Sequence, residues 1–110
     1  MSDIQNDIKN VVTENPIVLF MKGTPMFPQC GFSATVVEIL NRMNVEFVGV
    51  NVLDSDELRQ GIKDFSDWPT IPQLYVKGEF VGGCDIVREM YETAELHDYM
   101  KQQGFEVEVA

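Results

Sequence analysis

The stretch IVLFMKGTPMFPQCGFSATVVEIL, residues 17–40, predicts the centre of the fold. Residues 17–21 are a purely apolar run, which is typical of a buried strand and far too short to span a membrane. Residues 22–29 contain one glycine and two prolines, which favour a loop. Apolar residues then recur at helical spacing from Gly31 onward. The stretch therefore predicts a strand, a loop and a helix, with Cys30 where the helix begins.

The same patterns predict the elements outside this stretch. Asp54 and Glu57 resemble a capping box and predict the start of a helix, and Lys77-Gly78 predicts a hairpin turn. The other expected elements are a helix at 3–13, strands at 47–52, 73–76 and 79–81, and a last helix from Asp85, in two pieces. In that last helix we expect four residues to face inward: Ile86, Met90, Leu96 and Met100. In the helix from residue 31, five apolar residues lie on or near one face: Phe32, Val36, Val37, Leu40 and Met43. The order α-β-α-β-α-β-β-α-α predicts an α/β fold, a small mixed sheet with helices on both faces.

Composition restricts the class of protein. The 110 residues suit one domain, 1–110, with a short tail at about 104–110. The net charge of −10 argues against non-specific binding to nucleic acid. The beginning of the chain lacks a signal-peptide pattern, so we expect a soluble cytoplasmic protein that does not bind membranes. The one histidine, His97, lies among polar residues of a predicted helix, where we expect a solvated side chain.

Cys30 is the candidate reactive group. Unpaired N–H groups and the helix dipole at the start of a helix favour a thiolate, and Lys22 at the end of the preceding strand can add a positive charge. Ser33 stands where a C-x-x-C motif would have its second cysteine. A reductase of this kind must therefore resolve a mixed disulfide at Cys30 with an outside thiol or with Cys84. The other possibility is that the protein is not mainly a reductase. Ser33 can also serve as a hydrogen-bonding residue of the helix start.

Two further segments suggest a binding site. In Thr70-Ile71-Pro72, the proline favours extended geometry at Ile71, and a trans bond at the start of a strand is the commoner case. In Gly82-Gly83-Cys84-Asp85, the glycines allow another backbone or a ligand to approach closely. The helix start that follows can receive an anion, and Asp85 can either cap that helix or bind an ammonium group.

Together these residues resemble a known family. The segments Lys22-Gly23-Thr24-Pro25, Cys30-Gly31-Phe32-Ser33, Trp68-Pro69-Thr70-Ile71-Pro72-Gln73 and Gly82-Gly83-Cys84-Asp85-Ile86 are similar to the monothiol glutaredoxins of the CGFS type, in their single-domain bacterial form. The similarity runs in order from the first helix to about Gln103. It implies a thioredoxin-like fold with a four-stranded mixed sheet, a glutathione site and a labile [2Fe–2S] cluster.

The resemblance also implies roles for single residues. Cys30 would be the redox-active residue and the cluster ligand, shared with a second subunit. Lys22 and Arg59 would hold the glycine carboxylate of glutathione. The backbone of Ile71, set by a cis bond to Pro72, would pair with the cysteinyl part. The backbone of Cys84 and the side chain of Asp85 would receive the γ-glutamyl end.

The cysteine count then predicts an assembly. A [2Fe–2S] cluster takes four ligands, usually thiolates, and the chain has two cysteines. Two copies of Cys30 with two glutathione thiolates complete the set, which predicts a homodimer bridged by the cluster. Cys30 and Cys84 from both copies are the competing set. The expected function is delivery of the cluster to apo iron–sulfur proteins, in cluster biogenesis and iron homeostasis, with a BolA-type protein as partner.

Other functions stay open at this point. Cys30 could reduce glutathionylated proteins as a glutathione-dependent oxidoreductase, although the loop at 23–29 resembles members that reduce poorly, so whether the chain is an enzyme is uncertain. A disulfide between Cys30 and Cys84 is a further variant. The chain could also be a binding module without metal or turnover. Met26 and Phe27 are either a partner contact or loop packing, and residues 106–110 carry no recognisable motif.

Overall fold

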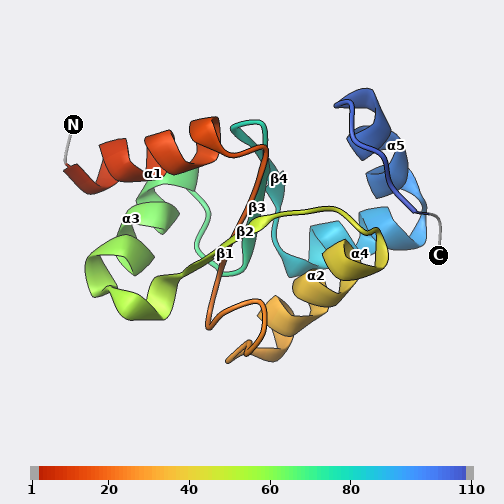
Figure 1. Ribbon diagram of the computed structural model, residues 1–110. Helices are drawn as coiled ribbons and strands as arrows, with labels where there is room; N and C mark the ends of the chain where they lie inside the picture. Colours follow the sequence, from red (N-terminus) through yellow and green to blue (C-terminus); the bar gives the residue numbers. More distant parts are fainter. Residues whose placement is uncertain (1–2, 109–110) are drawn as a thin grey trace.

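Four strands form one mixed sheet in the order β2-β1-β3-β4 (Figure 1). The computed structural model describes residues 3–108. The strand β1 (Ile17–Met21) pairs in parallel with β2 (Val48–Asn51) and antiparallel with β3 (Gln73–Val76), which forms a hairpin with β4 (Glu79–Gly82). Lys77 and Gly78 both have positive φ, as a two-residue hairpin turn requires. The predicted strands and hairpin are confirmed.

The central strand β1 is buried on both faces, as its uninterrupted apolar sequence predicts. Ile17, Leu19 and Met21 belong to one core and Val18 and Phe20 to the other, because successive side chains of a strand point to opposite faces. The carboxyl end of this strand leads straight into the loop before Cys30. The residues around that loop are therefore attached to the most completely buried segment of the sheet.

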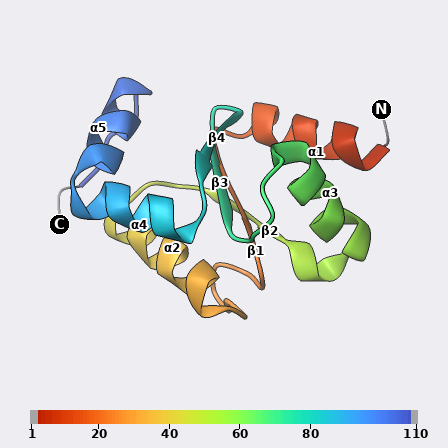
Figure 2. The same ribbon diagram turned by 180° about the vertical axis from the view of Figure 1, so that it is seen from behind.

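Helices cover both faces of the sheet, as predicted (Figures 1 and 2). On one face lie α1 (Asp3–Glu14) and α3 (Asp56–Ser66), whose Ile8, Val12 and Ile62 pack on β1 and β3. On the other lie α2 (Gly31–Arg42), α4 (Cys84–Glu92) and α5 (Glu95–Gln102). A short 3-10 helix, η1 (Val52–Asp54), joins β2 to α3. Within residues 3–108 no helix is long and apolar enough to cross a membrane.

Several boundaries differ from the predictions. The cap of α3 is Ser55, whose Oγ accepts a hydrogen bond from the N–H of Leu58 at 3.2 Å, so the predicted box beginning at Asp54 is wrong. The strand β2 is two residues shorter than predicted, and α4 begins at Cys84 after the N-cap Gly83. The final segment is not a loose tail over its described part: Phe105 and Val107 pack on the core, and the N–H of Glu108 donates to Met43 O at 3.0 Å. Residues 109 and 110 lie outside the described residues.

Three predicted side-chain environments are wrong. His97 is only 7% exposed and stacks on Tyr91, with ring centroids 5.4 Å apart, because the turn into α5 folds it back over α4. Ile86 is 37% exposed, although it was expected to face inward. Phe32 is 62% exposed, although its spacing puts it on or near the face that Val36 and Leu40 bury. Each lies in the first turn of its helix and stays partly open to solvent.

Candidate functional site

The junction of β1 and α2 positions the reactive thiol. Cys30 is the N-cap of α2, with extended backbone geometry, and its side chain is half-buried. Ser33 is completely buried, and its Oγ accepts a hydrogen bond from the N–H of Lys22 at 3.1 Å. This bond joins the beginning of the loop, directly after β1, to the first turn of the helix. Lys22 and Cys30 are thereby held in one fixed arrangement, and Ser33 is more than an ordinary helix-start residue.

The surroundings of Cys30 favour its thiolate. The sulfur of Cys30 makes no capping hydrogen bond to the first turn of α2. The nearby N–H of Ser33 is nevertheless the largest cause that lowers the pKa of Cys30. Partial burial opposes this, and the N–H of Phe32, the charge of Lys22 and the hydroxyl of Ser33 add to the lowering. These are the helix-start and cation effects that the sequence predicted.

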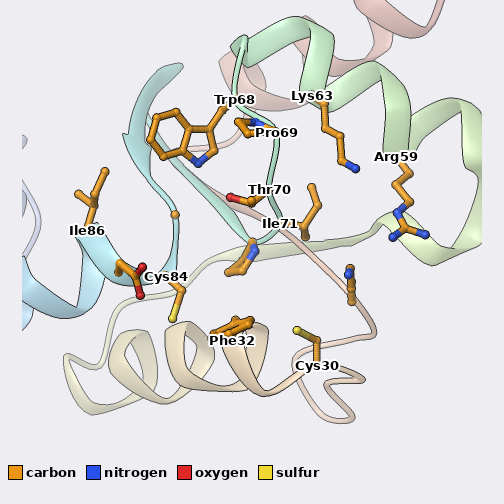
Figure 3. Close-up of a pocket in the computed structure, with 14 residues that line it drawn as sticks. Cys30, Phe32, Arg59, Lys63, Trp68, Pro69, Thr70, Ile71, Cys84 and Ile86 are labelled. Atoms are coloured by element: carbon orange, nitrogen blue, oxygen red, sulfur yellow. The ribbon is translucent and has the colours of Figure 1, made fainter.

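A cleft of about 480 Å³ opens beside Cys30, within the usual range of ligand sites (Figure 3). All seven residues that the sequence indicated line it, although they come from five separate segments of the chain. The lining residues are Lys22, Cys30, Phe32, Arg59, Lys63, Trp68, Pro69, Thr70, Ile71, Pro72, Gly83, Cys84, Asp85 and Ile86.

One end of the cleft is cationic. Arg59 and Lys63 project from α3 toward the same side of the cleft (Figure 3). Lys22, which directly follows β1, lines the cleft as well. Three of the eight basic residues of a chain with net charge −10 therefore line one cleft. This concentration favours an anionic ligand group, such as a carboxylate. The sequence reading missed Lys63, although its spacing of four residues from Arg59 on a predicted helix puts both on one face.

The middle of the cleft is built around a cis peptide bond between Ile71 and Pro72, as the resemblance implied. Gly83 lies so close to this segment that an added Cβ would be 3.3 Å from Pro72 O and 3.4 Å from Trp68 Nε1. The need for close approach therefore explains a glycine here. Asp85 is well exposed beside the cleft, with one carboxylate oxygen 3.5 Å from Arg88 Nη2. It does not cap α4, because Gly83 holds that position.

The two cysteines have different environments. Cys84 is 8% exposed, and burial is the main cause that raises its pKa; Asp85 and Cys30 raise it further, against the charge of Arg88. Cys30 is half-buried and its pKa is lowered. Both are free thiols in the structure. Of the two thiols, Cys30 therefore forms the nucleophilic or metal-binding thiolate more readily, and Cys84 stays protonated to higher pH.

Apolar side chains also reach the cleft. Phe32, Trp68 and Ile86 lie along it and are all partly exposed (Figure 3). Trp68 packs against Phe80, with ring centroids 5.8 Å apart. The sequence gave no role to these three residues. Their closeness in sequence to the predicted site residues could have indicated them: each lies within one helical turn or one loop of such a residue.

Comparisons with known proteins identify the family. A family model described as Glutaredoxin matches residues 17–81. The protein named "Probable monothiol glutaredoxin 2" of Rickettsia typhi is 56% identical over 96 residues, covering 87% of this chain and 86% of that protein. Its namesake from Rickettsia conorii is 58% identical over 98 residues, with 89% and 88% covered.

Solved structures give the same result. The structure titled "Solution structure of reduced poplar apo GrxS14" has a TM-score of 0.80 at 52% identity and covers 90% of this chain and 91% of that one. A truncated mutant of Trypanosoma brucei 1-C-Grx1 has a TM-score of 0.88 at 34% identity, with both chains covered completely. The four-stranded mixed sheet between helices is thus the thioredoxin-like fold that the resemblance implied. With its family model, its relatives and a C-x-x-S site in agreement, the chain belongs to the glutaredoxin family and is a monothiol glutaredoxin.

Proposed function

We propose that this protein binds glutathione in the cleft, shares a [2Fe–2S] cluster with a second copy of itself, and delivers that cluster to apo-proteins. The observation that carries the proposal is the contrast between the two thiols beside a cation-lined cleft. Cys30 is accessible and its pKa is lowered, whereas Cys84 is buried and its pKa is raised. Each copy therefore contributes one good thiolate ligand.

The residues present fit glutathione. Its glycine carboxylate matches the cationic end formed by Lys22, Arg59 and Lys63. Its γ-glutamyl group carries both an ammonium and a carboxylate, which suit Asp85 and the first N–H groups of α4. The extended segment at Ile71 lies between these ends. We propose that glutathione spans the cleft, with its thiol near Cys30.

The ligand count favours a dimer that includes glutathione. A [2Fe–2S] cluster takes four thiolates, and Cys30 from two copies supplies two of them. Two glutathione thiolates complete the set. The alternative set, with Cys84 from both copies, requires a buried thiol to lose its proton where burial already raises its pKa. The cluster is cargo in this scheme, and half of its ligands are held without covalent bonds, so an acceptor protein can displace them.

The partners follow from the family resemblance. Apo iron–sulfur proteins would be the acceptors, and a BolA-type protein would be a second partner that shares or receives the cluster. A role in iron homeostasis and a cytoplasmic location belong to the same proposal. In each case the partner meets the protein at the open side of the cleft, where Cys30 is accessible.

A second candidate function is thiol–disulfide exchange, favoured by the lowered pKa of Cys30. The Cys30 thiolate would attack the glutathione sulfur of a glutathionylated protein, and the protein thiolate would leave and take up a proton. A second glutathione thiolate would then attack the new disulfide at Cys30. That step releases oxidised glutathione and restores the Cys30 thiolate.

The decisive experiment is anaerobic reconstitution with iron, sulfide and glutathione. We expect visible absorbance, a dimeric mass and two glutathiones per dimer. Cys30→Ser should abolish all three, and Cys84→Ser should retain them. A cluster retained by Cys30→Ser would exclude the proposed ligand set. Rapid deglutathionylation by metal-free protein, without cluster uptake, would favour the second candidate.

A further inference from the structure

The loop before Cys30 is a tight turn that holds two apolar side chains in solvent. The N–H of Phe27 donates to Thr24 O at 3.0 Å, and the N–H of Thr24 donates to Phe27 O at 3.3 Å. Gly23 and Pro28 form a β-bridge below this turn. Met26 is 81% exposed and Phe27 is 71% exposed. We call these two residues the apolar tip.

The loop is also fixed to the sheet. The N–H of Gly23 donates to Asn51 Oδ1 at 2.9 Å, and the N–H of Gln29 donates to Lys22 O at 2.8 Å. Pro25 lies so near Gly49 of β2 that a Cβ added there would be 2.5 Å from Pro25 Cγ. The apolar tip is therefore exposed on a loop whose backbone is held in place by these contacts. A pre-formed apolar group loses little entropy on binding, which suits it to contact another surface.

Charge indicates what that surface is. No residue from 23 to 37 is charged, although the chain has a net charge of −10. A two-fold contact brings the same patch of both copies together. An acidic patch would repel itself in such a contact, whereas an uncharged apolar patch would not. The surface that includes the apolar tip and Cys30 is therefore suited to meet a second copy of this acidic chain.

We propose that the apolar tip of one copy contacts the apolar tip of the other when the two Cys30 thiolates hold one cluster. This inference rests on the function proposed above. Cys30 lies between the apolar tip and Phe32, which is 62% exposed. A cluster of two irons is small beside these side chains. Two thiolates that share it bring their flanking residues into reach of each other.

The size of the contact predicts when it forms. A stable protein interface buries about 1,200–2,000 Å² in total, and two side chains from each copy supply only a small part of that area. The apolar tip should therefore orient and tighten the cluster-bridged dimer without forming a dimer in its absence. Cluster-free protein should remain monomeric.

The test compares charged variants of the apolar tip by the mass of the cluster-bound protein over a range of concentrations. Phe27→Asp puts two carboxylates face to face and should weaken the cluster-bound dimer roughly tenfold or more. Gln102→Asp is the control for the added charge, because Gln102 is exposed at the end of α5, which belongs to another part of the fold. It should leave the dimer unchanged. Glutathione affinity, measured by calorimetry, and the circular dichroism spectrum should match wild type in both variants.

A mixture of two variants makes the test specific. Phe27→Lys alone should weaken the dimer as Phe27→Asp does, and the two together should form mixed dimers in preference to either homodimer. A Phe27→Asp dimer as tight as wild type, or a mixture without this preference, would overturn the inference. If Phe27→Asp spares the dimer but slows transfer to an apo-acceptor, the apolar tip contacts acceptors instead. If wild type takes up no cluster, the proposed function itself fails.

Discussion

The Ser33 hydroxyl interacts with both Lys22 and Cys30, and replacing this hydroxyl tests whether it links them. Ser33→Ala removes the acceptor of the hydrogen bond from the Lys22 N–H, 3.1 Å long, inside a completely buried position. The backbone of α2 is kept, as is the N–H of Ser33, the largest cause of the lowered pKa of Cys30. The variant therefore isolates the hydroxyl.

Two effects on stability oppose each other. An unsatisfied N–H costs about 1–3 kcal/mol, and we use the lower end because Lys22 as a residue is only partly buried. Alanine is a better helix former than serine, which returns about 0.5 kcal/mol. We expect the free energy of unfolding to fall by about 0.5–1 kcal/mol, a midpoint shift of roughly 2–4 °C for a domain of this size.

The thiolate gives a second readout. The hydroxyl is one of the groups that lower the pKa of Cys30, so the pKa should rise part of the way toward its ordinary value. A folded-state pKa below the unfolded one adds stability above the unfolded pKa, and this stability is lost as the pH falls through the folded pKa. The variant loses part of that contribution. The difference in the free energy of unfolding between wild type and the variant should therefore grow as the pH rises.

The assays are urea unfolding of reduced protein at several pH values and the pH dependence of Cys30 alkylation. Ser55→Ala is the matched control, because it removes the cap of α3 and costs about 1 kcal/mol, while Ser55 is not among the groups that shift the pKa of Cys30. It should not move the Cys30 titration. An unchanged titration in Ser33→Ala, or an equal shift in Ser55→Ala, would refute the role assigned to the hydroxyl.

Three further predictions concern the site and the core. Cys30 should be alkylated at a lower pH than Cys84, because its pKa is lowered while burial raises the pKa of Cys84. Peptide mass mapping of protein alkylated over a pH series measures both thiols, and alkylation of both over the same pH range would contradict this. Lys63→Gln should weaken glutathione binding several-fold in calorimetry, most strongly at low salt, while Lys9→Gln has no effect. Leu74→Ala should lower the free energy of unfolding by about 2–5 kcal/mol, since Leu74 is completely buried in the sheet; a loss below about 1 kcal/mol in urea unfolding would show that its core relaxes around the gap.

Sequence reasoning predicted the elements whose signals are local. The apolar run of β1, the Lys77-Gly78 turn and the start of α2 at Cys30 each depend on a few adjacent residues, and each is found where it was expected. The cis bond before Pro72 came from the family resemblance and not from the local pattern. All seven indicated residues line one cleft, although their contacts with glutathione stay predictions.

The predictions failed where the surroundings of a residue depend on distant parts of the chain. Phe32 and Ile86 have the spacing of core residues, but they line the cleft, whose other walls come from distant segments of the chain. His97 has polar neighbours in sequence, yet stacking on Tyr91 buries it. Residues 104–108 gave no signal because their packing partners, such as Met43, are far away in sequence.

Trp68 has a consequence for how this protein can be observed. It is the only tryptophan of the chain, it lies in the wall of the cleft, and its side chain is partly open to water. The indole emission of the whole protein therefore comes from a single place, the one where a ligand would enter. A change in the polarity around that ring, or energy transfer to a coloured group bound nearby, would alter the entire signal. The unlabelled protein thus contains its own optical reporter, and rates of loading and release can be followed in real time without modifying a residue.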